Sequence, residues 1–185
     1  MITPSDAQSL DRLLLARSVR KGDFLLASGK RSSFYVDARL TTMSAEGLAL
    51  IGRMGLAAIR QEGWLPRSVG GLTMGADPVA YAVAVASTRE GPILEAFSVR
   101  KEAKAHGTGR RIEGNFQSGD AVVVVEDVIT SGGSAHSAIE AIRAEGGRVL
   151  GVLAVVDREE GGKKSLQDAG VPVAVLTTAT RLGLR

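Results

Sequence analysis

The chain of 185 residues contains no cysteine and only two histidines. Disulfide bonds, thiolate metal sites and thiol catalysis are therefore excluded, and so is a metal site built mainly from histidine. No apolar run approaches the length that crosses a membrane, and the first ten residues, MITPSDAQSL, are too polar for a signal peptide. We therefore expect a cytoplasmic protein with no membrane partner.

Aromatic residues are also scarce, at 4% of the chain, whereas glycine is plentiful at 23 residues. This balance favours an α/β fold with closely packed helices, and the length suits one domain with its own core. The formal net charge of +3 is mild and fits an anionic small molecule at least as well as nucleic acid. Aromatic residues are not interleaved with the basic ones, so we expect no nucleic-acid partner.

Apolar segments of strand length alternate with helical patterns over most of the chain, which predicts a parallel sheet joined by right-handed crossovers. Ser5 is expected to cap a first helix, and a long helix is expected over residues 44–63. Between these helices, two short apolar pieces flank a polar turn at 28–32 and predict an antiparallel hairpin. The strands of the parallel sheet are expected at 68–71, 93–99, 122–125, 148–156 and 171–176.

The most informative stretch is AVVVVEDVITSGGS, at residues 121–134. Four consecutive valines predict a strand buried on both faces, because a half-exposed strand would alternate. Glu126 and Asp127 follow, where this strand is expected to leave the sheet. Neighbouring side chains of an extended backbone point opposite ways, so the two acids can straddle a ligand that has two hydroxyls.

The TSGGS loop that follows these acids precedes an alanine-rich helix. Its hydroxyls, its glycines and the helix N-terminus together suit a phosphate group. The Gly-Lys-Ser/Thr of a Walker A loop and the GxGxxG fingerprint are both absent. The stretch therefore indicates a sugar phosphate, although an ordinary βα turn rich in small residues has a similar composition.

Two further polar segments follow predicted strands. Residues 72–77 (LTMGAD) precede Pro78 in the first turn of an apolar helix and form a second loop that can hold an anion, although a plain βα turn fits equally well. Residues 100–114 (RKEAKAHGTGRRIEG) hold six potential cations within a dozen residues. Most charge runs of this kind are simply solvated loops.

Three stretches resemble the signatures of one family. The 121–134 stretch is similar to the phosphoribosyl pyrophosphate (PRPP) motif of type I phosphoribosyltransferases. The order Ser-Gly-x-x-Ser-x-x-Tyr-x-Asp, from Ser28 to Asp37, resembles the N-terminal signature of orotate phosphoribosyltransferases. The order Arg-Lys-x-x-Lys-x-His-Gly, from Arg100 to Gly107, resembles their catalytic loop.

The resemblance covers essentially the whole chain and implies the type I phosphoribosyltransferase fold. That fold has a central, mostly parallel sheet flanked by helices, together with a small N-terminal hood. It implies a single domain over residues 1–185, with the hood built mainly from residues 1–40, approximately, plus the C-terminal segment.

The resemblance also implies a reaction. Ribose 5-phosphate passes from PRPP to N1 of orotate, which gives orotidine 5′-monophosphate and pyrophosphate in the de novo biosynthesis of UMP. It implies Mg²⁺ held mainly by PRPP, with no side-chain ligand assigned, and a homodimer in which the cationic loop reaches the neighbouring site. The implied catalytic residues are Lys101, Lys104, His106 and Asp127.

Roles are implied residue by residue. The TSGGS loop holds the 5-phosphate, the two acids contact the ribose hydroxyls, and the cationic loop closes over the pyrophosphate, where His106 can also donate a proton. The implied PRPP-binding residues are Thr73, Met74, Arg100, Lys101, Lys104, His106, Glu126, Asp127, Val128, Ile129, Thr130, Ser131, Gly132, Gly133 and Ser134. The implied orotate-binding residues are Thr130, Arg158 and the backbone of Phe34 and Tyr35.

Some alternatives stay open at this point. Arg158 could equally be a surface arginine beside Glu159 and Glu160. Many family members carry lysines where this chain has Ala27 and Met74, so the resemblance implies that neutralisation of the pyrophosphate shifts to Lys101, Lys104 and Arg100. The rival functions are transfer to another base, or a non-catalytic regulator that senses PRPP and binds nucleic acid.

Overall fold

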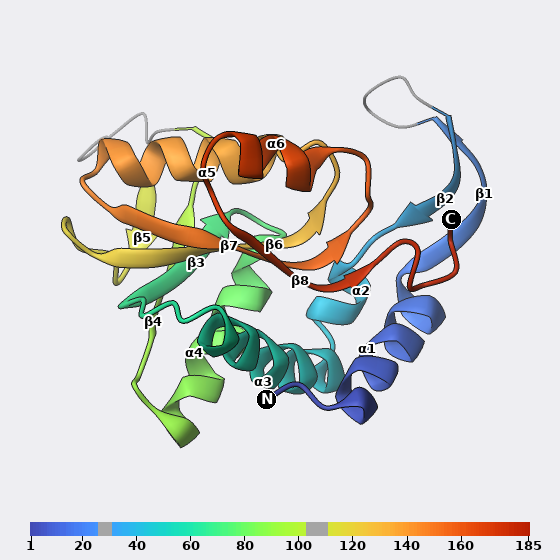
Figure 1. The fold of residues 1–185 in the computed structure, drawn as a ribbon, viewed down its shortest axis with the longest axis horizontal. Coiled ribbons are helices and arrows are strands. Elements are labelled where there is room, and N and C mark those ends of the chain that lie inside the picture. The colour runs from blue at the N-terminus through green and yellow to red at the C-terminus, as the bar shows by residue number, and fades with distance from the viewer. Residues whose placement is uncertain (26–30, 103–110) are drawn as a thin grey trace.

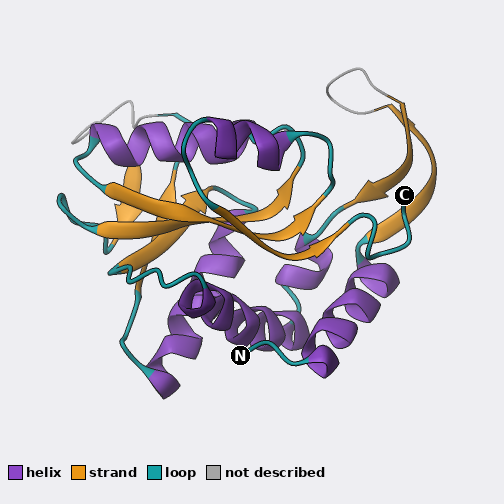
Figure 2. Cartoon of the chain, in the orientation of Figure 1, coloured by secondary structure: helices purple, strands orange, loops and turns teal. Residues whose placement is uncertain are grey.

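A six-stranded sheet lies at the centre of the computed structural model, which describes residues 1–25, 31–102 and 111–185 (Figures 1 and 2). The strand order is β5-β4-β3-β6-β7-β8. All neighbouring strands are parallel except β5, which runs antiparallel to β4, so the predicted mostly parallel sheet is confirmed. The strands are β3 (Ser68–Leu72), β4 (Glu95–Val99), β5 (Ile112–Gly114), β6 (Ala121–Ile129), β7 (Arg148–Asp157) and β8 (Val173–Thr178).

Helices cover both faces of this sheet. One face carries α1 (Pro4–Arg17), α2 (Arg39–Thr42), α3 (Ala45–Gln61) and α4 (Ala76–Glu90), and the other carries α5 (Gly133–Ala144) and α6 (Gly162–Asp168) (Figure 1). Each face therefore has its own apolar core. In the described part of the chain, no helix combines the length and hydropathy needed to cross a membrane.

Strand β6 belongs to both cores. Val123 and Val125 pack toward α3 and α4, Val122 and Val124 pack toward α5, and all four are fully buried, as the valine run predicts. The strand is longer than expected, because its ladder with β7 continues to Ile129. The two acids of the motif therefore lie within the sheet rather than beyond its edge.

The N-terminal region forms the predicted hairpin, with β1 (Val19–Leu25) antiparallel to β2 (Arg31–Val36). Thr3, and not Ser5, caps α1, because the Thr3 hydroxyl accepts a hydrogen bond from the N–H of Asp6. The C-terminal segment returns to this region, where Thr177 and Arg181 each donate to Asp11 at 2.7 Å. The extent of the hood and the single-domain boundary stay predictions.

Candidate active site

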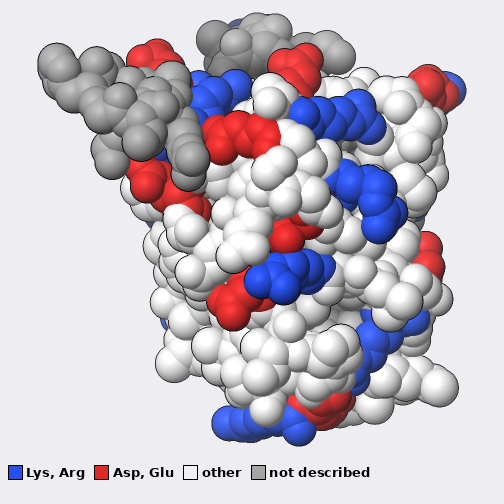
Figure 3. Space-filling model, turned by 90° about the vertical axis from the view of Figure 1, so that its left-hand side faces the viewer, with Lys and Arg blue, Asp and Glu red and all other residues white. Residues whose placement is uncertain are grey.

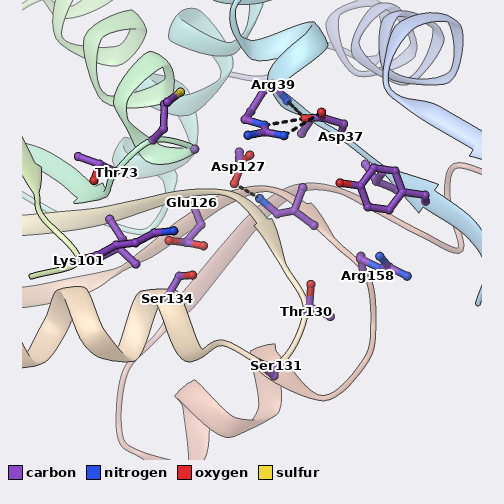
Figure 4. Close-up of a pocket in the computed structure, with 17 residues that line it drawn as sticks. Asp37, Arg39, Thr73, Lys101, Glu126, Asp127, Thr130, Ser131, Ser134 and Arg158 are labelled. Carbon is purple, nitrogen blue, oxygen red and sulfur yellow. Dashed lines mark hydrogen bonds and ion pairs between the residues drawn. The ribbon is translucent and has the colours of Figure 1, made fainter. Parts of the chain in front are cut away.

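A cavity of about 590 Å³ opens at the carboxyl ends of β3, β6 and β7, beside the end of β2 (Figure 4). Ligands of parallel α/β sheets bind at this edge, because the strand ends and helix N-termini converge there. Its lining comes from residues 35–39, 72–75, 126–128, 130, 131 and 134, together with Lys101 and Arg158. Four of the segments singled out in the sequence therefore meet in one place.

The TSGGS loop connects β6 to the N-terminus of α5. Gly132 has φ +84°, a left-handed conformation that favours glycine, and it directly precedes the helix. Gly162, after β7, packs behind the loop: a Cβ there would lie 2.5 Å from the Thr130 carbonyl oxygen. Because the Gly162 N–H also donates to that carbonyl at 3.0 Å, a second loop holds this one in shape.

Of the predicted phosphate-binding residues, Thr130, Ser131 and Ser134 line the cavity, whereas Gly132 and Gly133 do not. Two predicted residues lie between the acids and this loop. Val128 lines the cavity, whereas the side chain of Ile129 is buried in the core. The roles of all these residues stay predictions.

Glu126 and Asp127 point to opposite sides of β6, as extended geometry requires (Figure 4). Glu126 is 6% exposed, and burial, with a smaller contribution from the charge of Asp127, raises its pKa to about 8. Burial also raises the pKa of Asp127, although the Val128 N–H, which donates to Asp127 Oδ1 at 2.9 Å, acts in the opposite direction. At neutral pH the free site therefore holds Glu126 largely in its neutral form.

The loop after β3 packs against Asp127. Thr73, Met74 and Gly75 line the cavity, and a Cβ on Gly75 would lie 2.4 Å from Asp127 Oδ1. Met74 is 60% exposed, so this lining position carries an uncharged thioether side chain.

The cationic stretch leaves the sheet at the end of β4 and returns at β5. Its two ends lie side by side, since the Arg100 N–H donates to the Arg111 carbonyl at 2.8 Å. The Arg111 guanidinium donates to the carbonyls of Arg100 and Lys101 and to the Ser137 hydroxyl of α5, at 3.0–3.2 Å. Arg111 thus attaches the base of this stretch to α5.

The other predicted members of that stretch differ in their placement. Lys101 lines the cavity, whereas Arg100 does not and pairs with Glu113 at 3.6 Å. Lys104 and His106 lie outside the described residues, as does Ala27 in the hood.

Arg158 is a buried residue, and the surface interpretation of it is wrong. It is 4% exposed, its guanidinium carbon lies 4.8 Å from the centroid of the Phe34 ring, and its Nη2 pairs with Glu160 at 2.8 Å. Nη2 also donates to the Ser32 hydroxyl at 3.2 Å, while the buried Nε has no partner among the residues that the structure describes. Burying a cation with an unused donor is costly, which is typical of groups reserved for a ligand.

Phe34 and Tyr35 therefore have different roles in the structure. Tyr35 lines the cavity, whereas Phe34 is 5% exposed and supports Arg158 with its ring. A backbone contact from either residue to the pyrimidine stays a prediction.

One charged pair in the cavity was not predicted. Arg39, in the first turn of α2, donates from Nε and Nη2 to the two carboxylate oxygens of Asp37 at 2.8 and 2.9 Å (Figure 4). Asp37 belongs to the hood signature, but Arg39 follows it by only two residues and looks like an ordinary surface arginine in the sequence. The one sequence feature that could have indicated this pair is an acidic and a basic residue two positions apart at the end of a predicted strand.

Comparison with known proteins agrees with this geometry. Residues 55–172 match the family model of the phosphoribosyl transferase domain. The fold and the site thus define a type I phosphoribosyltransferase.

The relatives are more specific. The chain is 41% identical over 183 residues to an orotate phosphoribosyltransferase of Rhodopirellula baltica, covering 97% of this chain and 95% of the relative. It is 43% identical over 180 residues to that of Aquifex aeolicus, covering 96% and 97%. The chain belongs to the orotate phosphoribosyltransferase family.

A solved structure extends the match. The crystal structure of Mycobacterium tuberculosis orotate phosphoribosyltransferase in complex with PRPP is 37% identical, covers 97% of this chain and 99% of that one, and has a TM-score of 0.80. The predicted family, fold and enzyme class are confirmed.

Proposed function

We propose that this cavity transfers ribose 5-phosphate from PRPP to N1 of orotate and releases pyrophosphate. The observation that carries the proposal is the arrangement of the strand ends, which bring the two acids of β6, a phosphate-type loop and the buried cation Arg158 to one cavity. The product enters pyrimidine nucleotide biosynthesis. A cytoplasmic location stays a prediction from the sequence.

The sugar phosphate occupies the middle of the cavity in this proposal. The hydroxyls of Thr130, Ser131 and Ser134 and the N-terminus of α5 hold the 5-phosphate, while Glu126 and Asp127 contact the ribose hydroxyls. The sugar gains positive charge as its bond to pyrophosphate lengthens. The negative charge of Asp127 stabilises this developing positive charge and so lowers the barrier to transfer.

Pyrophosphate leaves over the loop that follows β3. Lys101 supplies positive charge from the described part of the cationic stretch, and Lys104 and His106 are proposed to close over the leaving group and exclude water. Because Met74 brings no charge to this loop, these cations carry more of the neutralisation than in relatives with lysine there.

Mg²⁺ fits the donors of the site. The described residues contain no cluster of three or more metal-ligating side chains, but Glu126 and Asp127 offer carboxylate oxygens beside the ribose site. Mg²⁺ commonly binds through one or two carboxylates plus substrate phosphates. When bound, it would neutralise charge on the pyrophosphate.

Orotate is proposed to enter beside the hood. Its carboxylate faces Arg158, whose guanidinium is already fixed by Glu160 and Phe34, and Tyr35 and Thr130 lie at the same end of the cavity. A planar guanidinium held in place is suited to a planar carboxylate.

A homodimer is the proposed assembly. A groove of about 610 Å³ lies between α3 and α4, where Tyr81 and Val85 are 50% and 65% exposed. The Tyr81 hydroxyl lies 3.1 Å from that of Ser98 on β4, the strand that leads into the cationic stretch. A second copy seated on this groove would therefore lie close to the base of the catalytic loop.

The activity is tested by mixing the protein with PRPP, Mg²⁺ and orotate and following the loss of orotate absorbance in the ultraviolet. Turnover with uracil or a purine, but not with orotate, would support transfer to another base. Absence of turnover with every base would support a PRPP-sensing regulator. On the face seen in Figure 3, acidic and basic side chains are interspersed, which does not favour a nucleic-acid surface.

A loop variant tests the mechanism and the dimer together. Lys104→Ala should lower kcat on the order of a hundredfold while changing PRPP binding much less, because its charge acts on the leaving group. Equal losses in kcat and in binding would contradict this role.

Mixing inactive Lys104→Ala and Asp127→Asn chains should restore activity if the loop serves the neighbouring site, and should restore none if each chain is self-sufficient.

A further inference from the structure

Arg111, which has no role in the reaction proposed above, contacts the backbone that carries Lys101. Its guanidinium donates to the Arg100 carbonyl from Nε at 3.2 Å and from Nη2 at 3.1 Å. Nη2 also donates to the Lys101 carbonyl at 3.2 Å. Both carbonyls lie beyond Val99, where the parallel ladder between β3 and β4 ends. The guanidinium therefore takes the place of a strand partner for these two backbone acceptors.

The same residue is attached to α5 at two points. Nη2 donates to the Ser137 hydroxyl at 3.0 Å, and the Arg111 backbone N–H donates to Glu145 Oε1, at the end of the helix, at 3.0 Å. Ser137 follows Ser134 by three residues, so their side chains lie on the same face of α5. Because Ser134 lines the cavity, Arg111 joins the Lys101 backbone to the face of the helix that follows the TSGGS loop.

The loop after β3 is attached to the same strand end from the other side. The Thr73 N–H donates to the Val99 carbonyl at 2.8 Å, two residues before Lys101. Thr73, Lys101 and Ser134 all line the cavity (Figure 4). The ammonium group of lysine sits on a long, flexible stem, so the position of the backbone determines which part of the cavity its charge reaches. The Lys101 backbone is thus fixed relative to both anion-binding loops.

We propose that Arg111 is a positioning residue, which fixes Lys101 relative to the TSGGS loop so that one PRPP molecule reaches both. The inference rests on the proposed function for the identity of the ligand, whose 5-phosphate and pyrophosphate lie at opposite ends of the ribose. The role of Arg111 is geometric, because its donors already serve two carbonyls and a hydroxyl. A guanidinium offers these donors in a rigid fork, whereas the ammonium group of lysine is a point charge on a flexible stem.

Binding of pyrophosphate with Mg²⁺ to the full-length protein, measured by calorimetry, tests this role without turnover. Arg111→Gln should weaken binding about fivefold, because Lys101 loses its fixed position, and an unchanged affinity would overturn the proposal. Arg111→Lys should weaken binding by a similar factor, since it keeps the charge but not the fork. Recovery of the original affinity in Arg111→Lys would also overturn the proposal, because charge alone would then suffice. Arg143→Gln, on the exposed side of the last turn of α5, is the matched control and should change nothing.

A double-mutant cycle distinguishes positioning from a general structural role. Lys101→Met should weaken pyrophosphate binding, and adding Arg111→Gln should cause no further loss, because Arg111 acts through Lys101. Losses that multiply in the double variant would overturn the proposal.

Ser137→Ala is a milder second variant, because it removes only the side-chain contact with α5. It should weaken pyrophosphate binding about twofold alone and not at all when combined with Lys101→Met. An equal loss in both backgrounds would contradict the inference. Pyrophosphate binding is measured whether or not orotate is converted, so failure of the proposed transfer and failure of the Arg111 role give different results.

Discussion

On the sheet side of the cavity, Glu126 and Asp127 have no ion-pair partner among the described residues, whereas on the hood side Asp37 pairs with Arg39 and Arg158 with Glu160, both at 2.8 Å. The sheet side therefore keeps acids whose pKa values are raised by burial, and the hood side keeps charges that are already compensated. The difference indicates two tasks. Unpaired acids can respond to a substrate, while paired groups keep a fixed geometry before it arrives.

The largest expected effect comes from removing charge on the sheet side. Asp127→Asn should lower kcat/KM on the order of a hundredfold, or about 2.7 kcal/mol, because the developing positive charge of the sugar loses its counter-charge. Glu126→Gln should cost far less, since Glu126 is largely neutral in the free site. Steady-state kinetics at neutral pH provide the measurement. Equal losses in the two variants would remove the distinction between these acids.

The hood side should respond in stability. Glu160→Gln leaves the buried Arg158 without its counter-charge and should reduce the free energy of unfolding by about 2 kcal/mol. The matched change Arg31→Gln breaks a pair whose side chains are 79% and 67% exposed, and it should cost under about 0.5 kcal/mol. Urea denaturation of both variants measures the difference. A similar cost for both would show that burial of the Arg158 pair is unimportant.

The effect that is smallest per pH unit is a pH dependence of stability, with opposite signs on the two sides of the cavity. The pKa of Glu126 rises from 4.5 to about 8 on folding, so between these values the folded state binds a proton that the unfolded state has lost. Stability of the free protein should therefore fall as pH rises through this window, by at most about 1.4 kcal/mol per pH unit. Asp37, whose pKa its Arg39 hydrogen bonds lower, should stabilise the fold above its unfolded pKa and lose that contribution on acidification.

Thermal unfolding of the free protein across this pH range, compared with Glu126→Gln, measures the first of these contributions. The variant should show a flatter profile between pH 5 and pH 8, approximately. An unchanged profile would mean that Glu126 is ionised in the folded protein.

The sequence predicted the parts of the site that depend on local patterns. The valine run, the acids and the glycine-rich loop were recognised because each is contiguous and chemically distinctive. The acids and the hydroxyl residues of that loop line the cavity at one edge of the sheet. The end of β6 was placed too early, since polar residues suggested the edge of the sheet. The partner strand β7 continues the ladder past them, and such tertiary pairing leaves no local signal.

The rest could not be predicted for related reasons. Strand β5 has three residues and forms only because β4 is available to pair with it. Burial of Arg158 depends on Phe34 and Ser32, which lie more than 120 residues earlier in the chain. Arg39 gains its position from a pair with Asp37 and from the approach of β6, and neither is visible as spacing in the sequence.

The strand order also gives the reaction a direction. Strand β6 lies between β3 and β7, and neighbouring strands are about 4.8 Å apart, so the loops proposed for the leaving group and the incoming base are separated by about 10 Å. The anomeric carbon would then move across the strand ends, from the loop after β3 toward the loop after β7. A slip of β6 by one residue would exchange the faces of Glu126 and Asp127. The hydrogen-bond register of β6 with β3 and β7 therefore determines which acid faces each side of the strand.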